Sequence, residues 1–212
     1  MNSLNISDLA LHFGAQQKTS ELTAFIDFIR PLALRTVVEI GTKKGGTLLV
    51  WMLLASHDAK IISIDLPFGP FGGGDFTNEL NAVLAFRRPA QQVMFIRADS
   101  HQPQTKDELV RILQGRAIDL MFIDGDHSYA GVKCDYEMYS PLVAPGGIVV
   151  FHDVLPHPGF PGVGVNRFWK ELTEGRQFRT FLDPEHNIGY GMWGGIGVVA
   201  EPGPQPVNVA QR

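Results

Sequence analysis

Short apolar runs rich in β-branched residues alternate with longer helical stretches along most of the 212-residue chain. The runs are TVVEIG, IISID, VMFIRADS, IDLMFIDGDH and GIVVFHD, and a segment with helical character follows each of them. Strands that alternate with helices pair in parallel, because each crossover helix returns the chain to the same end of the sheet. The alternation therefore predicts an α/β domain with a parallel sheet and helices on both faces.

The two ends of the chain depart from this alternation. FRTFLD and GGIGVVAE read as two further strands, and only the short segment PEHNIGYGMW joins them. That connection leaves no room for a crossover helix, so we expect an antiparallel hairpin at one edge of the sheet. Near the N-terminus, an amphipathic helix over Ser20 to Arg30, with Phe25 on its apolar face, is a candidate cover for a ligand site or contact of a homo-oligomer.

Composition narrows the class of protein. The chain has 18 Lys+Arg against 22 Asp+Glu and is 44% apolar, which is typical of a globular domain. It has no basic cluster to bind nucleic acid and no apolar run near the ~20 residues that a membrane span needs. It has no signal-peptide pattern, and its single cysteine, Cys134, leaves no disulfide to form within the chain. We therefore expect a cytoplasmic protein with a small-molecule partner.

A carboxylate follows every strand of the parallel block. The acids are Glu39, Asp65, Asp99, Asp124 and Asp153. Ligands of open parallel sheets bind beyond the carboxyl ends of the strands, so these side chains converge on one crevice. Like charges repel there unless a ligand or a metal compensates them. One such acid is as easily a helix cap or a solvated loop residue, but five in succession indicate a ligand site.

The loop after the first strand, EIGTKKGG, lets the backbone approach a ligand, because Gly41 and Gly45 carry no side chain. It matches neither the G-x-G-x-x-G fingerprint of dinucleotide sites nor the G-K-[ST] of phosphate loops, which disfavours a nicotinamide dehydrogenase. Glu39 suits a positively charged group, and Asp65 can accept both hydroxyls of a ribose. An amine joined to a nucleoside without phosphate describes S-adenosylmethionine (SAM).

Several segments resemble class I SAM-dependent methyltransferases. VVEIGTKKGGT resembles the first cofactor motif, IISID the second, and RADS the segment beside the adenine. The block FIDGDHSYAGVKCDYEMYSPLVAPGGIVVFHD resembles the small-molecule group that includes the macrocin O-methyltransferases and the cephalosporin-hydroxylase-like proteins. More distantly, it resembles the catechol and caffeoyl-CoA O-methyltransferases.

This resemblance covers roughly Thr36 to Val199. It implies a Rossmann-like, doubly wound sheet of seven strands, parallel except for one antiparallel strand near the C-terminus. We accordingly divide the chain into a helical N-terminal cap segment (1–35), a SAM-dependent methyltransferase domain (36–201) and a flexible tail (202–212).

The resemblance also implies roles for individual residues. The methionine end of the cofactor is lined by Glu39, Gly41 and Thr42, with Gly45 in the same loop; Asp65 holds the ribose, and Asp99 and Ser100 lie at the adenine. In metal-dependent relatives a divalent cation is held by the first acid after strand four, which also borders the cofactor, and by two residues after strand five. These correspond to Asp124, His152 and Asp153. Relatives carry an acid or an amide in place of His152, and an imidazole suits zinc, iron or manganese better than magnesium.

Methyl transfer to a hydroxyl requires that the hydroxyl lose its proton, either to a base or through a metal that lowers its pKa. His127 and His152 are the candidate bases, and His101 and His157 also follow strand ends. His127 is alternatively a helix cap or a partner that orients Asp124.

Two Pro/Gly-rich loops, 66–75 and 155–164, leave strand ends on the expected ligand side. Long loops in this position form substrate mouths or lids. Phenylalanines in or beside them predict an apolar lining for such a mouth: Phe68, Phe71, Phe76 and Phe160.

The sequence favours an O-methyltransferase acting on a small hydroxylated molecule such as a sugar or a natural product, with help from a divalent metal (Mg, Mn or Zn). The Asp124, His152 and Asp153 set also approaches the composition of a mononuclear iron site, so a metal-dependent hydroxylase or oxygenase is an alternative. A non-catalytic SAM-binding partner of another enzyme is a third. The sequence does not identify the methyl acceptor, because acceptor pockets are built by loops that vary between proteins.

Overall fold

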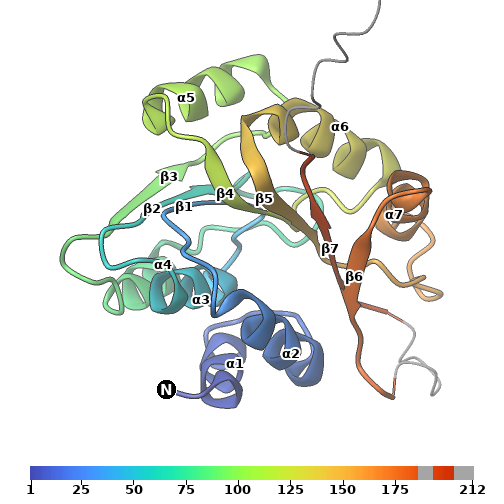
Figure 1. Ribbon diagram of the computed structural model, residues 1–212, viewed down its shortest axis with the longest axis horizontal. Coiled ribbons are helices and arrows are strands. Elements are labelled where there is room, and N and C mark those ends of the chain that lie inside the picture. The colour runs from blue at the N-terminus through green and yellow to red at the C-terminus, as the bar shows by residue number, and fades with distance from the viewer. Residues whose placement is uncertain (186–192, 203–212) are drawn as a thin grey trace, which may run out of the picture.

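A computed structural model describes residues 1–185 and 193–202 of the chain. Seven strands form one sheet in the order β3-β2-β1-β4-β5-β7-β6 (Figure 1). The strands are β1 (Thr36–Ile40), β2 (Lys60–Ile64), β3 (Gln92–Ile96), β4 (Ile118–Ile123), β5 (Val143–Phe151), β6 (Phe178–Phe181) and β7 (Ile196–Ala200). The helices are α1 (Ser3–His12), α2 (Thr19–Ile29), α3 (Gly46–Leu54), α4 (Thr77–Leu84), α5 (Pro103–Leu113), α6 (Tyr129–Tyr139) and α7 (Val165–Thr173).

The strand directions confirm the predicted sheet. β1 pairs in parallel with β2 and β4, and β4 pairs in parallel with β5. β7 runs antiparallel between β5 and β6, so one strand of the seven is reversed. The β6–β7 pair is the expected C-terminal hairpin, with β6 at the sheet edge. The middle of its connection, and residues 203–212 of the expected tail, lie outside the described residues.

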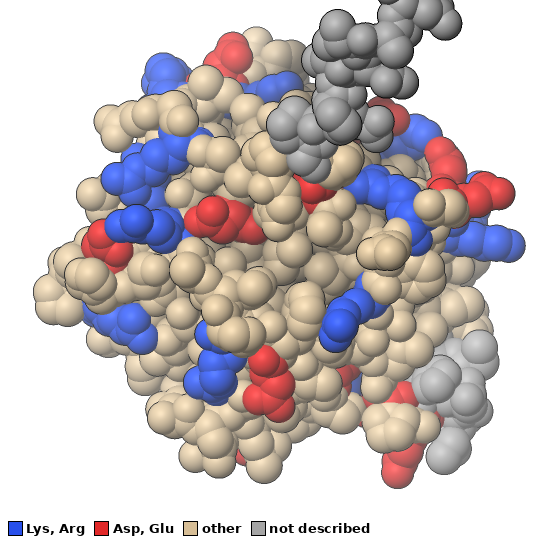
Figure 2. Space-filling view, in the orientation of Figure 1, with Lys and Arg blue, Asp and Glu red and all other residues tan. Residues whose placement is uncertain are grey.

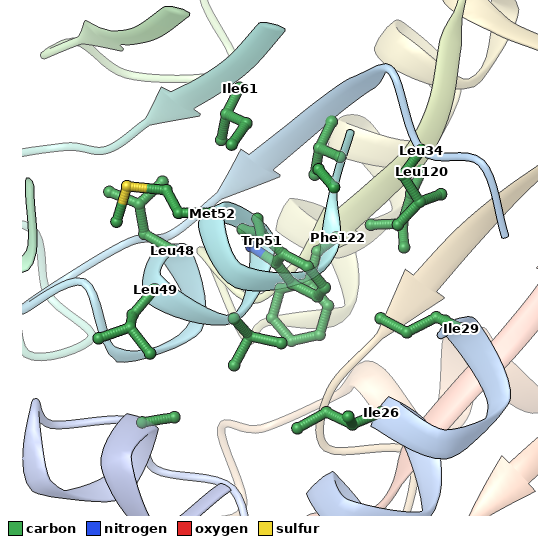
Figure 3. Packing of buried hydrophobic residues seen from close by; sticks show 14 of the residues in the cluster. Ile26, Ile29, Leu34, Leu48, Leu49, Trp51, Met52, Ile61, Leu120 and Phe122 are labelled. Carbon is green, nitrogen blue, oxygen red and sulfur yellow. The ribbon is translucent and has the colours of Figure 1, made fainter. Parts of the chain in front are cut away.

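Helices cover both faces of the sheet, as the alternation predicted. In Figure 1, α1 to α4 lie on one face and α5 to α7 on the other. Successive strand residues face opposite sides, so Val37 packs into the core under α1 to α4 whereas Val38 packs into the core under α5 to α7. Figure 3 shows the first core, where Trp51 of α3 lies against Phe122 of β4 with ring centroids 5.4 Å apart.

The N-terminal segment contains two helices, although the sequence pattern indicated only one. α1 was missed because serines occupy part of its buried face: Ser3 and Ser7 are buried beside Ile6 and Ala10. Internal hydrogen bonds satisfy these hydroxyls, since Ser7 Oγ donates to the Ser3 carbonyl and accepts from Thr23 Oγ1. Because serines stand where apolar residues would repeat, the sequence of α1 shows no clear helical pattern of apolar residues.

One further expectation needs correction. Phe25 of α2 is fully buried and packs on Trp51 and Phe181, so the apolar face of α2 belongs to the core and neither covers the ligand site nor stands free for a second subunit. A 3-10 turn over Ser140–Leu142 reverses the chain after α6, and residues Pro145–Gly147 then form part of β5. The pairing register of β4 and β5 shifts between Ile118 and Leu120 to accommodate them.

None of the helices within the described ranges combines the length and the apolar character that crossing a membrane requires.

Gly41 lies where the ends of β1 and β4 come closest. Its φ is +89°, and a Cβ built there would stand 2.1 Å from the carbonyl oxygen of Asp124. Gly115 has a similar φ of +80°, but no described atom lies within 4 Å of its added Cβ. At both positions the backbone conformation would strain any residue with a side chain, but only at Gly41 would a side chain also clash with neighbouring atoms.

We predict that Gly115→Ala lowers the free energy of unfolding by about 1–2 kcal/mol, the strain of a left-handed L residue. Gly41→Ala adds a clash with backbone that cannot move without displacing β4, so it lowers the free energy by about 4 kcal/mol or more. Urea unfolding of both variants measures the difference. Equal losses would show that the contact with Asp124 relaxes freely.

Candidate functional site

A cavity of about 970 Å³ opens at the carboxyl ends of the parallel strands. Its wall is built by the loops that follow β1 to β5 and by residues 14–17, which link α1 to α2. This is the edge where an open parallel sheet binds ligands, beside the point between β1 and β4 where the strand order reverses. The volume stands at the upper end of the ~300–1,000 Å³ range of small-molecule sites.

Four of the five predicted strand-end acids line this cavity: Asp65, Asp99, Asp124 and Asp153. Glu39 does not. It is still inside β1, is 0% exposed, and accepts a hydrogen bond of 2.8 Å from Nε1 of Trp51. Burial raises the pKa of the Glu39 carboxyl to about 7. Glu39 therefore lies beneath the site, which corrects the expectation that it lines the cavity.

The glycine loop is tied to the end of β2. Oδ1 of Asp65 accepts hydrogen bonds of 3.0 Å from the backbone N–H groups of both Thr42 and Lys43, and Oδ2 lies 3.5 Å from the guanidinium of Arg97. Gly41 and Thr42 line the cavity as expected. Gly45 does not, because it is the N-cap of α3, has a φ of +91° and faces Leu80.

The loop after β3 places Asp99, Ser100 and His101 on the cavity wall. The Asp99 carboxylate caps the loop by accepting hydrogen bonds of 2.9 Å from the His101 backbone N–H and from Nε2 of Gln102. Behind them, Asp135 of α6 is 0% exposed, and its Oδ1 lies 3.4 Å from Nε2 of His101. Asp135 raises the pKa of His101 to about 9, so the site carries an imidazolium at neutral pH.

Asp124, His152 and Asp153 form the predicted cluster. One ligand atom of each lies within 4.8 Å of the others. Nδ1 of His152 lies 3.3 Å from Oδ1 of Asp124 and 3.5 Å from Oδ1 of Asp153. The residues meet because β4 and β5 are paired neighbours, with Ile123 opposite Phe151 at their ends. Asp153 adopts a φ of +62°, in the left-handed region that residues other than glycine rarely occupy.

Each member of the cluster has a partner on its outer side. Nε2 of Gln17 donates to Oδ2 of Asp124 at 2.9 Å, and Nδ1 of His127 lies 2.7 Å from Oδ2 of Asp153. Nε2 of His152 lies 3.3 Å from Oε1 of Glu21. Sequence reasoning missed Gln17 and Glu21. They precede the first strand, and the only local signal was the position of Glu21 in the first turn of a predicted helix.

The cluster is strongly coupled electrostatically. Burial lowers the pKa of His152, but the negative charges of Asp124 and Asp153 outweigh it and raise the pKa well above its ordinary value. Burial acts to raise the pKa of Asp153, yet His152 and His127 together lower it to about 2. Without another cation, the positive charge of His152 is what holds the two carboxylates together.

Aromatic rings border the cluster on the side of the two Pro/Gly-rich loops. Phe71 stacks on His127 with ring centroids 5.2 Å apart, and Phe160 meets His157 edge-on at 4.8 Å. Both phenylalanines line the cavity, as expected. Phe68 and Phe76 do not: Phe68 is 75% exposed, and Phe76 packs against the core beneath α4.

The fold and the position of the cavity define a class of protein. The strand order with one reversed strand, and a ligand cavity above the β1–β4 junction, are those of the Rossmann-like class I methyltransferases. Residues 38–154 match a family described as methyltransferase domain. The chain therefore belongs to this methyltransferase family.

Two solved structures share the fold. The O-methyltransferase TomG from Streptomyces achromogenes, in complex with SAM, is 20% identical with a TM-score of 0.61, over 96% of this chain and 91% of that one. MycE of the mycinamycin pathway, in complex with Mg, S-adenosylhomocysteine (SAH) and mycinamycin VI, is 17% identical with a TM-score of 0.58, over 95% of this chain and 57% of that one.

The chain is also similar to the uncharacterized protein y4gI of Sinorhizobium fredii. The two are 28% identical over 171 residues, or 78% of this chain. The matched part spans only 18% of that longer protein.

We predict that Glu39 makes stability fall with rising pH. The folded carboxyl has a pKa of about 7 against 4.5 for the free group, so between these values the folded state holds a proton that the unfolded state has released. The free energy of unfolding therefore falls across this window, by up to about 3 kcal/mol. Glu39→Gln keeps an acceptor for Trp51 and removes this contribution. Urea unfolding of both proteins at pH 5 and pH 8 measures it, and identical pH dependence would contradict it.

We predict that Asp135→Asn moves the pKa of His101 from about 9 toward 6.5, because the buried charge that stabilises the imidazolium is gone. In the native protein this pair stabilises the fold fully below about pH 6.5, and the contribution is lost as the pH rises through about 9. An NMR titration of the His101 ring measures both values. Asp107→Asn, at an exposed position of α5, is the control. An unchanged His101 titration in Asp135→Asn would contradict the assignment.

Proposed function

We propose that this chain is a SAM-dependent O-methyltransferase that acts on a hydroxyl of a small molecule with the help of a divalent cation. The observation that carries the proposal is the arrangement of one cavity wall. The glycine loop, Asp65 and the Asp99–Ser100 pair follow one another along it, and the Asp124–His152–Asp153 cluster lies beside them. A cofactor wall next to an ion-binding cluster suits methyl transfer to an oxygen nucleophile.

The residues present fit SAM. Gly41 leaves no space for a side chain, so the backbone itself is the wall where the methionine end would lie. Asp65 is 8% exposed and its Oδ2 has no hydrogen bond from a described residue, which leaves an acceptor for a ribose hydroxyl. We assign Thr42 to the methionine end and Asp99 and Ser100 to the adenine. The likeness to TomG, whose structure holds SAM, supports this assignment.

The residues present also fit a divalent cation. Glu21 is an acceptor beside Nε2 of His152, so that nitrogen carries a proton and Nδ1 faces the carboxylates. Three inward atoms, Oδ1 of Asp124, Nδ1 of His152 and Oδ1 of Asp153, are then left for one positive charge. That charge is a proton on Nδ1 or a metal ion. One nitrogen and two oxygen donors favour manganese or zinc over magnesium, although the MycE structure contains Mg.

SAM supplies an electrophilic methyl group, so the protein has to deliver a deprotonated oxygen in line with it. His127 is the better placed of the two candidate bases. Its Nδ1 is held by Asp153 at 2.7 Å, whereas its Nε2 lies 3.6 Å from Oδ1 of Asp124, beyond hydrogen-bond distance, and can take the acceptor's proton. Both nitrogens of His152 are occupied by carboxylates, so His152 serves as a ligand. A bound cation would lower the pKa of the hydroxyl.

The aromatic part of the cavity lining supports a small-molecule acceptor. Phe71 and Phe160 border the cluster and offer apolar surface to a ring or chain that carries the hydroxyl. On the face shown in Figure 2, Lys and Arg side chains are interspersed with Asp and Glu rather than gathered in a basic stripe. This favours a small acceptor over a nucleic acid.

We predict that calorimetry detects SAM binding and that Asp65→Ala weakens it by about 1.5–3 kcal/mol, the value of a lost hydrogen bond to a charged group. Asp75→Ala is the control, because Asp75 lies in the loop after β2, caps Thr77 and does not line the cavity. Equal affinities for Asp65→Ala and the native protein would remove Asp65 from the ribose role.

We predict that chelator-treated protein loses methyl transfer to a panel of hydroxylated glycosides, macrolides and phenols, and that Mn²⁺ or Zn²⁺ restores it better than Mg²⁺. Mass spectrometry detects the methylated product, and NMR distinguishes an O-methyl from other methyl groups. Full activity after chelation would contradict the metal proposal and favour a metal-free site in which a histidine alone is the base. Oxygen uptake without methylated product would instead favour the hydroxylase alternative.

A further inference from the structure

Glu21 is a buried carboxylate that the family match does not include, since the match begins at residue 38. It is 0% exposed, and within the described residues its two oxygens have three polar neighbours. Oε1 accepts a hydrogen bond of 2.8 Å from the Lys18 backbone N–H, and Oε2 accepts one of 2.8 Å from the Gly195 backbone N–H. Oε1 also lies 3.3 Å from Nε2 of His152. Glu21 thus joins the start of α2, the end of β5 and the segment that leads into β7.

Gln17 has a similar position on the other side of the cluster. It is 4% exposed, and its Nε2 holds the outer oxygen of Asp124 at 2.9 Å. Because Asp124 accepts through Oδ2, its Oδ1 is left to face His152. Within the described residues, Gln17 and Glu21 are the cluster's hydrogen-bonding neighbours from the N-terminal helical segment.

We infer that Gln17 and Glu21 are positioning residues of the Asp124–His152–Asp153 site, so that the N-terminal helical segment is part of the functional unit. The inference rests on the metal site of the proposed function and names what orients its ligands. Glu21 fixes the His152 ring with Nδ1 toward the two carboxylates, and Gln17 fixes which oxygen of Asp124 faces inward. Partners on the outer side of metal ligands typically change metal affinity ~10–100-fold when they are removed.

The chemistry of the Glu21 contact explains why a carboxylate stands there. The Lys18 and Gly195 N–H groups each take a different oxygen of Glu21, so the position needs two acceptor atoms, which a carboxylate has and an amide lacks. A negative charge beside Nε2–H makes the opposite nitrogen a stronger donor to a cation. It also adds a third negative charge to a site that already holds two carboxylates, which favours a divalent ion over a single proton.

The test compares Glu21→Gln and Gln17→Leu with matched controls. Asp27→Asn makes the same acid-to-amide change on the same helix, where Asp27 accepts from Ser3 Oγ at 2.5 Å. Gln91→Leu replaces another buried glutamine, which donates to the Met52 and Ser56 carbonyls away from the cavity. For all four variants, calorimetry measures the affinities for Mn²⁺ and for SAM, and thermal unfolding measures the melting temperature.

We expect Glu21→Gln and Gln17→Leu to weaken Mn²⁺ binding ~10-fold or more, and both controls to keep native affinity whatever their melting temperatures. SAM affinity measured without metal should stay within about twofold of native in Glu21→Gln and in both controls, since none of these three residues lines the cavity. Mn²⁺ affinity within twofold of native in Glu21→Gln and Gln17→Leu would overturn the inference.

A second measurement separates this inference from the metal proposal. ¹⁵N NMR of the His152 ring at fixed pH, without metal, reports whether Nε2–H is held. Loss of the slowly exchanging Nε2 proton in Glu21→Gln, with its retention in Asp27→Asn, supports the positioning role even if the native protein binds no divalent ion. A native spectrum in Glu21→Gln would overturn that role whether or not metal binds.

Discussion

The structure depends on the close approach of two carboxylates and an imidazole at the ends of neighbouring strands. Asp124 follows β4, while His152 and Asp153 follow β5, and the parallel pairing of these strands brings the three side chains together. Two carboxylates this close repel strongly unless a positive charge lies between them. The raised pKa of His152 and the lowered pKa of Asp153 are both consequences of that requirement.

The surroundings of this cluster are arranged to hold it in one geometry. Each member is fixed from outside, by Gln17, Glu21 or His127, so that one atom of each faces inward. Charged groups in a low-dielectric interior are tolerated when their remaining hydrogen-bonding atoms are satisfied. The same contacts that make the cluster stable as a structural feature therefore make it suitable for an ion.

The N-terminal helices serve both packing and the site. α2 buries Phe25 and Ile26 in the core that Figure 3 shows, and its first turn carries Glu21 to the cluster. The linking residues before it reach the glycine loop, where a Cβ on Gly46 would stand 2.2 Å from the backbone nitrogen of Ala15. The methyltransferase core defined by 38–154 is thus completed by a segment outside it, and that segment closes one side of the cavity.

The sequence by itself determined the sheet, its hairpin and most of the cavity wall. The spacing of apolar residues and the length of connections are local properties that can be read along the chain. Residues that follow strands, such as Asp65, Asp124 and Asp153, converge in any parallel sheet of this strand order. Tertiary structure alone decided which of these residues reach the cavity and what surrounds them. Glu39 lies beneath the site because it is inside β1, where its side chain points to the face of the sheet that α3 covers and contacts Trp51. Gln17 and Glu21 joined the site because helix packing brought distant residues together, and no local pattern encodes such contacts.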